Sequence, residues 1–193
     1  MKKIGITGGI GSGKSYVSRR LQELFQIPVY DCDSRAKTLM QTDAEIRAGL
    51  EQMFGKEVYD EAGWLNRPLL AAYIFGDKAH LANVNALVHP RVKHDFRAWA
   101  EEQDCEIVAV ESAILYSSRM NDAVDYVIGV TAPEEVRIGR VQERGACTRE
   151  QVLDRMQSQQ NENGTPDYEL LNDGVASVDK QLEEILRKIE IEY

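Results

Sequence analysis

A glycine-rich loop near the start of the chain constrains the fold more than any other feature of the sequence. Residues 8–15 read Gly-Gly-Ile-Gly-Ser-Gly-Lys-Ser, which is the G-x-x-x-x-G-K-S pattern. Glycines let backbone N–H groups point at phosphate oxygens, Lys14 adds a positive charge, and the Ser15 hydroxyl can bind Mg²⁺. Apolar residues 4–7 predict a strand before the loop, and the spacing of apolar residues within 17–25 predicts a helix after it. The pattern in this context predicts a nucleoside triphosphate site. Its candidate binding residues are Gly9, Gly11, Ser12, Gly13, Lys14, Ser15 and Tyr16.

Five short strand-like segments alternate with segments of helical periodicity. They are residues 3–7, 27–31, 107–111, 126–131 and 168–172. This alternation predicts an α/β fold of three layers, in which helices cover both faces of a parallel sheet. Ligands of such sheets bind beyond the carboxyl ends of the strands. The side chains that follow the strands are therefore the first candidates for chemistry.

The connection between the second and third predicted strands is about 75 residues long, too long for a simple loop, and its signals are nearly all helical. It predicts an inserted helical subdomain. One helix is expected to begin at Asp33 or Ser34, and the next at a capping box that starts with Thr42. The fourth helix is expected to run through Leu81, Val84 and Leu87 and to end before His89-Pro90, which punctuates the chain.

Two further helices are predicted between the fourth and fifth strands. A capping box at residues 131–134, with a proline in the first turn, predicts the start of the first, and Gly145 predicts its end. Thr148 starts the second helix, which we expect to end near Asn161, before the turn cluster at residues 163–166.

Composition narrows the class of protein and of partner. The chain has 193 residues, enough for one sizeable core, and a formal net charge of −9 at pH 7. Because nucleic acid attracts surfaces rich in lysine and arginine, this balance argues against a nucleic acid partner. We expect a cytoplasmic protein with no membrane partner for three reasons. The cysteines are scattered, no leader-like segment follows Lys2 and Lys3, and the apolar runs are too short to span a membrane. The cysteines are Cys32, Cys105 and Cys147.

Two carboxylates follow the second predicted strand. A carboxylate beside a phosphate loop can hold Mg²⁺, usually through water, or accept the proton of an attacking hydroxyl. We take Asp33 as the candidate base and Asp31 as a candidate metal-binding residue. A compatible alternative for Asp33 is the N-cap of a helix that begins at Ser34.

Glu111 ends the third predicted strand, where phosphate-loop proteins commonly place an acidic residue that binds the metal. With Ser15 and Asp31 it completes the predicted Mg²⁺ site, and the alternative is a solvated glutamate at a strand end. His89 and His94 lack an H-E-x-x-H frame and make a poor metal site. For His89, a substrate contact and a histidine packed at a turn both stay open.

Three arginines share one face of the helix predicted after the fourth strand. Arg137, Arg140 and Arg144 are spaced i, i+3 and i+7. Guanidinium groups bind phosphate oxygens and stabilise charge as a phosphoryl group moves. We prefer Arg140 and Arg144 for this role, and the alternative for each is a solvated face neutralised by neighbouring glutamates.

Motifs spread over almost the whole chain resemble the dephospho-CoA kinase family of P-loop kinases. They are residues 7–15, Asp31-x-Asp33, Gly-Trp-Leu-Asn-Arg at 63–67, Ile-Phe at 74–75, Leu-Val-His-Pro at 87–90, and the helix with Arg140 and Arg144. The resemblance implies transfer of the ATP γ-phosphoryl group to the ribose 3′-hydroxyl of dephospho-CoA, the last step of coenzyme A synthesis, with Mg²⁺. It also implies a nucleotide-binding core, a substrate-binding insertion and a lid. The implied boundaries are 1–32, 104–132 and 167–193 for the core, 33–103 for the insertion and 133–166 for the lid.

The resemblance also implies roles for single residues. Asp33 matches the family's base, and Arg67 and His89 match positions in its substrate motifs. Lys14, Arg140 and Arg144 match its phosphate-binding cations, and Asn172 belongs to a block near the adenine. Ser117 stands where the family usually has glutamate, and Tyr16 where it commonly has threonine.

Two other functions stay open at this stage. A nucleoside or nucleotide kinase would use the same loop and carboxylate on a smaller acceptor. A non-catalytic nucleotide switch would need a partner protein and no small acceptor, and the lack of an N-K-x-D segment counts against a GTP-dependent one.

Overall fold

The computed structural model of the chain describes residues 1–145, 148–159 and 164–191. It has two compact units, which we name the core unit, residues 1–31 with 100–193, and the helical unit, residues 32–99. Cys147 and Asn161, which figured in the sequence-based expectations, lie outside the described residues.

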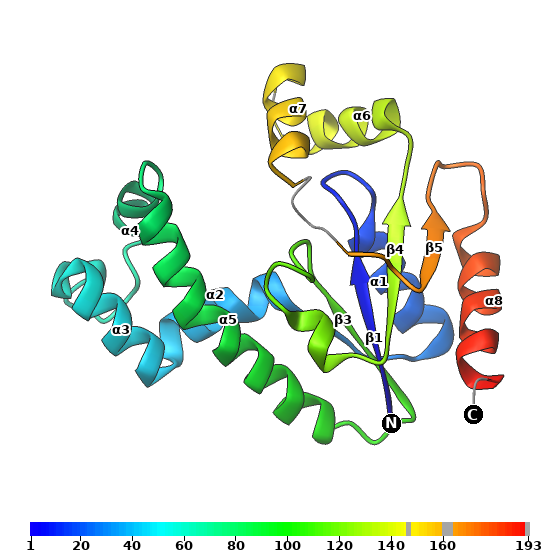
Figure 1. Ribbon diagram of the computed structural model, residues 1–193, viewed down its shortest axis with the longest axis horizontal. Coiled ribbons are helices and arrows are strands. Elements are labelled where there is room, and N and C mark those ends of the chain that lie inside the picture. Colours follow the sequence, from blue (N-terminus) through cyan, green and yellow to red (C-terminus); the bar gives the residue numbers. More distant parts are fainter. Residues whose placement is uncertain (146–147, 160–163, 192–193) are drawn as a thin grey trace. The chain divides into compact units, whose positions relative to one another are not determined.

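The core unit contains a parallel five-stranded sheet with the order β2-β3-β1-β4-β5 (Figure 1). The strands are β1 (Lys2–Thr7), β2 (Val29–Asp31), β3 (Ile107–Glu111), β4 (Tyr126–Thr131) and β5 (Tyr168–Leu171). The predicted class and all five strands are confirmed. Because β1 is central, the loop that follows it lies between the ends of β3 and β4.

Helices α1 (Lys14–Phe25) and α8 (Val178–Ile191) cover one face of this sheet. Their apolar stripes pack on side chains that alternate along the strands, such as the fully buried Ile4 and Ile6. On the opposite face Gly5 leaves room for Leu115, whose Cδ2 would lie 3.1 Å from a Cβ at position 5.

Two helices separate β4 from β5. Helix α6 (Glu134–Arg144) ends at the C-cap Gly145, as predicted, but its N-cap is Pro133, which makes no side-chain capping bond within the described part of the chain. The predicted capping box is therefore wrong, because Thr131 remains in β4. Helix α7 (Arg149–Ser158) does begin with a capping box, in which Thr148 and Gln151 bond reciprocally.

The helical unit is built from the helices between β2 and β3. They are α2 (Cys32–Thr42), α3 (Ala44–Phe54), the 3₁₀ turn η1 (Lys56–Val58), α4 (Arg67–Ile74) and α5 (Lys78–Glu101). Helix α3 is capped by Asp43, whose Oδ1 accepts a bond of 3.0 Å from the Ile46 N–H. The predicted cap at Thr42 is wrong, since Thr42 is the last residue of α2.

Helix α5 continues through Pro90, so the predicted end before His89-Pro90 is also wrong. A proline inside a helix removes one backbone bond and crowds the preceding turn. Two features offset this penalty. Val84, Val88 and Val92 form a buried stripe on both sides of the proline. Beyond it, Arg91 pairs with the N-cap Asp43 at 2.7 Å. No helix of the described residues has the length and apolarity to cross a membrane.

Candidate active site

The loop after β1 adopts a conformation that depends on its glycines. Gly11 and Gly13 have positive φ angles of +77° and +94°. A Cβ at position 11 would lie 2.5 Å from the Arg137 carbonyl oxygen, and one at position 13 would overlap the Asn172 amide. Only glycine fits both the backbone angles and the space. The loop leads into α1, so the helix N-terminus and its N–H groups adjoin the loop.

Lys14 and Ser15 begin α1, which is the helix predicted after the loop. The Lys14 Nζ donates a bond of 2.8 Å to the Gly8 carbonyl, which places the ammonium group across the loop. The N-cap Gly13 has no side chain to cap the helix, so the N–H groups of the first turn remain suited to an anion.

The predicted metal-binding residues come together at one edge of the sheet. Ser15 Oγ donates to Glu111 Oε1 at 2.8 Å. Asp31 is aligned with Glu111 in the register between β2 and β3. Mg²⁺ commonly uses one or two protein oxygens together with water and phosphate oxygens, so this donor set suits it. Ser18 was not predicted, yet it donates to Glu111 Oε2 at 2.7 Å. Its spacing of three residues from Ser15 was the available signal.

Asp33 lies two residues beyond the end of β2, in the first turn of α2, and its side chain is exposed. Because α2 begins at Cys32, Asp33 is inside the helix and the N-cap alternative is wrong. Two further candidates lie in the helical unit. Arg67 is the exposed first residue of α4, and His89 is half-buried inside α5 instead of at a turn. Their roles in binding remain predictions.

A pocket of about 420 Å³ adjoins the Gly13 end of the loop. Its lining includes Tyr16, Arg140, Arg144 and Asn172, so the structure brings these predicted nucleotide-binding residues together. Arg144 is exposed there, whereas Asn172 is buried.

Arg140 and Asn172 hold the loop in place. The Asn172 Nδ2 donates to the Ser12 carbonyl at 2.9 Å. The Arg140 Nη1 donates to the Asn172 carbonyl at 2.9 Å and to the Ser12 carbonyl at 3.3 Å. A residue from α6 and one from the end of β5 therefore meet on the same loop carbonyl.

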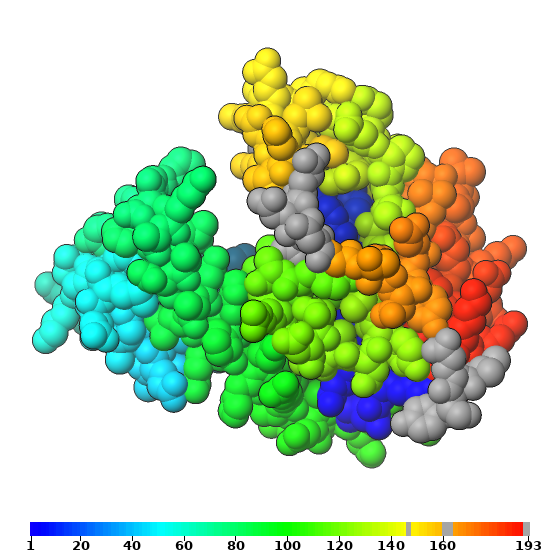
Figure 2. All heavy atoms as spheres, in the orientation of Figure 1, coloured from blue at the N-terminus to red at the C-terminus, as the bar shows by residue number. Residues whose placement is uncertain are grey.

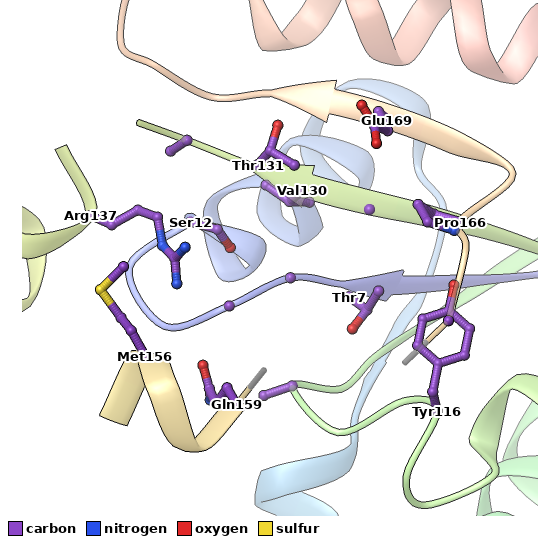
Figure 3. A pocket seen from close by; sticks show the side chains of 16 residues that line it. Thr7, Ser12, Tyr116, Val130, Thr131, Arg137, Met156, Gln159, Pro166 and Glu169 are labelled. Carbon is purple, nitrogen blue, oxygen red and sulfur yellow. The ribbon is translucent and has the colours of Figure 1, made fainter. Parts of the chain in front are cut away.

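A second pocket, of about 470 Å³, adjoins the Gly8–Gly9 end of the loop. Figure 3 shows six of its polar side chains, which are Thr7, Ser12, Tyr116, Thr131, Arg137 and Gln159. In Figure 2, blue atoms of the N-terminal segment are visible in a hollow beside the yellow-green and yellow atoms of α6 and α7.

Two residues from the helices after β4 contact the loop at Ile10. Arg137 Nε donates to the Ile10 carbonyl at 2.9 Å, and the Ile10 N–H donates to Gln159 Oε1 at 2.6 Å. From the sequence we preferred Arg140 and Arg144 to Arg137 for binding phosphate, and Gln159 was not predicted. The spacing of Arg137 three residues before Arg140 was a usable signal, but nothing in the local sequence marked Gln159.

Comparisons with known proteins show the family to which the chain belongs. The sequence model of the dephospho-CoA kinase family matches residues 2–176. A Bacteroides fragilis dephospho-CoA kinase is 42% identical over 188 residues, covering 95% of this chain and 91% of the relative. A Porphyromonas gingivalis dephospho-CoA kinase is 48% identical over 162 residues, covering 84% of this chain and 79% of the relative.

Solved structures show the same fold. A Thermus thermophilus protein has a TM-score of 0.80 and 30% identity, over 99% of this chain and 97% of its own. A dephospho-CoA kinase from Campylobacter jejuni has a TM-score of 0.69 at 17% identity, over 98% of both chains. A shikimate kinase from Bacteroides thetaiotaomicron has a TM-score of 0.56 and 12% identity, over 98% of this chain and 99% of its own. This likeness shows a shared fold alone. By its sequence over most of its length, the chain belongs to the dephospho-CoA kinase family.

Proposed function

We propose that the chain transfers the γ-phosphoryl group of ATP to the ribose 3′-hydroxyl of dephospho-CoA, which yields coenzyme A and ADP. One observation carries this proposal beyond family membership: the phosphate loop has a pocket at each end. A transferase needs room for a donor and an acceptor on opposite sides of the moving phosphoryl group. A nucleotide switch needs room for the nucleotide alone.

The pocket at Gly13 is the proposed nucleoside site. Tyr16 and Asn172 line it beside Arg140 and Arg144. The nucleotide would enter with its phosphates along the loop, where N–H groups of the loop and of the first turn of α1 and the Lys14 ammonium would bind them. Its γ-phosphoryl group would then lie toward Gly8 and Gly9, next to the second pocket.

Ser15, Glu111 and Asp31 are the proposed Mg²⁺ residues. A hydroxyl oxygen can bind the metal with a lone pair while its proton is donated to a carboxylate, and Ser15 already donates to Glu111. Bound there, Mg²⁺ would neutralise phosphate charge. Glu111 would keep the Ser15 lone pairs directed away from itself, and Asp31 would hold water at the same edge.

Asp33 is the proposed general base. Its position in the sequence, two residues beyond the end of β2, supports this role, because ligands of α/β proteins bind beyond the carboxyl ends of the strands. It would accept the proton of the 3′-hydroxyl as the oxygen attacks the γ-phosphorus. Lys14 would neutralise the charge on the phosphoryl oxygens, and Arg140 and Arg144 would add positive charge from the Gly13 end of the loop.

The remaining parts have proposed supporting roles. Residues 33–103 would bind the acceptor through Arg67 and His89, and residues 133–166 would act as a lid. Closure would exclude water, which would otherwise compete with the hydroxyl and hydrolyse ATP. Within the described part of the chain Cys32 and Cys105 are not joined in a disulfide, which suits the proposed cytoplasmic location.

The test is an acceptor comparison. Purified protein is incubated with ATP, Mg²⁺ and one acceptor at a time, and both ADP and the phosphorylated product are measured. We expect rapid, stoichiometric formation of coenzyme A and little reaction with nucleosides or nucleotides. Rapid turnover of a nucleoside with none of dephospho-CoA would favour a nucleoside kinase. Slow hydrolysis that ignores every acceptor would favour a switch.

A further inference from the structure

Arg137 carries donors that the rest of the described chain does not use. The one hydrogen bond of its guanidinium group within the described residues runs from Nε to the Ile10 carbonyl, which leaves Nη1 and Nη2 unbonded there. No ion pair to a described carboxylate is formed either. Burial lowers the pKa of Arg137, although the charge of Glu134 opposes this shift. A half-buried guanidinium with two open NH₂ groups is suited to binding an anion in bidentate fashion.

The space that Arg137 occupies depends on glycine at position 9. A Cβ there would overlap the Arg137 Nη2. The guanidinium therefore lies directly against the loop backbone, at the end of the loop that adjoins the 470 Å³ pocket. Glu169, a carboxylate that also lines this pocket, lies on β5 away from Arg137 (Figure 3).

Ser12 provides a second, independent observation. Its side chain is only 1% exposed, and its Oγ has no hydrogen-bond partner among the described residues. It lines the same pocket as Arg137. Buried hydroxyl groups are nearly always bonded, so an unpaired one beside a pocket points to a polar ligand atom.

We propose that Arg137 and Ser12 bind a phosphate group on the Gly8–Gly9 side of the loop. The inference rests on the proposed function, because that function brings two phosphate sources to this place. One is the γ-phosphoryl group of ATP, and the other is the diphosphate of dephospho-CoA. Both present tetrahedral phosphate oxygens to the guanidinium and the hydroxyl.

Calorimetric titration of ATP, ADP and dephospho-CoA into Arg137→Gln tests the proposal and separates the sources. A lost charge-assisted bond is expected to weaken binding about tenfold or more. If the γ-phosphoryl group is the ligand, the variant binds ATP more weakly than wild type does, while its affinities for ADP and dephospho-CoA are unchanged. If the diphosphate of the acceptor is the ligand, the variant binds dephospho-CoA more weakly, and its affinities for ATP and ADP are unchanged. Arg187→Gln removes the same charge from an exposed site on α8 and should change none of these values.

Ser12→Ala gives a check that does not depend on Arg137. Because the Ser12 hydroxyl is buried and unpaired, its removal should leave the melting temperature unchanged or raise it. The ligand whose affinity falls in Arg137→Gln should also bind Ser12→Ala more weakly than it binds wild type.

Unchanged affinities for ATP and dephospho-CoA in a well-folded Arg137→Gln variant would overturn the inference. If that variant melts early, unchanged affinities in Ser12→Ala overturn it instead. Failure of the wild-type protein to make coenzyme A would refute the proposed function separately. The ATP and ADP titrations would then still show whether Arg137 and Ser12 bind the γ-phosphoryl group of ATP.

Discussion

Ser15 and Glu111 are joined by a hydrogen bond of 2.8 Å, which links the first turn of α1 to the end of β3. Ser18, one turn further along α1, donates to the other oxygen of the same carboxylate at 2.7 Å. Two hydroxyl groups of one helix thus orient both oxygens of Glu111. These two bonds explain how the Glu111 side chain, at the end of β3, can hold a fixed position beside the phosphate loop.

Glu111→Gln should weaken Mg²⁺ binding in the nucleotide complex by about tenfold or more, because it removes the negative charge while keeping the side chain's size. Binding of ATP without metal should change little. Titration of Mn²⁺ followed by electron paramagnetic resonance measures the metal directly. Glu102→Gln, at an exposed position, is the matched control. Equal metal affinity in the Glu111 and Glu102 variants would remove Glu111 from the site.

Asn172→Ala should weaken ATP binding and lower stability by about 1–3 kcal/mol, since it leaves buried polar groups with fewer partners. Asn172 is 6% exposed, and its amide bonds both Ser12 and Arg140. Urea unfolding and ATP titration measure the two effects. Gln142→Ala, on the exposed side of α6, should show neither. A stable Asn172→Ala protein with normal ATP affinity would show that the loop needs no such support.

The sequence predicted the parts of the site that depend on local backbone chemistry. The loop glycines, the strand before them and the helix after them are read directly from residues 4–25, and the structure contains all three. Glu111 was predictable because strand ends of a parallel sheet converge on one edge.

The missed features depend on packing between distant segments. Pro90 signals a helix end locally, yet buried valines and the Arg91–Asp43 pair keep α5 continuous. Gln159 contacts Ile10 across 149 positions of the chain, and no local pattern encodes such a contact. The sequence shows Arg137 on a charged helix face. It does not show that the guanidinium lies against the loop, because this contact depends on the space left by Gly9.

Two glycines inside helices should respond oppositely to alanine. A Cβ at Gly49 of α3 would lie 2.6 Å from Leu87 Cδ2, so Gly49→Ala should destabilise the protein by about 1–3 kcal/mol through overpacking. A Cβ at Gly139 of α6 would meet nothing within 4 Å, so Gly139→Ala should stabilise it by about 0.5–1 kcal/mol. Chemical denaturation of both variants measures the difference. Stabilisation by Gly49→Ala would show that α3 and α5 are less closely packed.

The Asp43–Arg91 pair should make stability depend on pH in the acidic range. Burial alone would raise the pKa of Asp43, but bonds from the Ile46 N–H and Arg91 outweigh it and lower this pKa. A lowered folded-state pKa stabilises the ionised form. The contribution is therefore complete above the unfolded-state pKa of about 3.9 and is lost as pH falls through the lower folded-state pKa.

Asp43→Asn keeps a good N-cap but removes the charge. We expect it to be less stable than wild type at pH 7, by about 1–3 kcal/mol, and the difference to shrink in acid. Urea unfolding at a series of pH values tests this. A difference that stays constant down to the most acidic pH would mean that the charge of Asp43 does not matter.

The central claim is direct transfer to an alcohol that Asp33 deprotonates, and kcat of Asp33→Asn with ATP and dephospho-CoA tests it most directly. The asparagine keeps the size of the side chain and removes its basicity. We predict a fall in kcat of about 10²- to 10⁴-fold, with dissociation constants for both substrates close to those of wild type. A kcat within a few-fold of wild type would contradict the account.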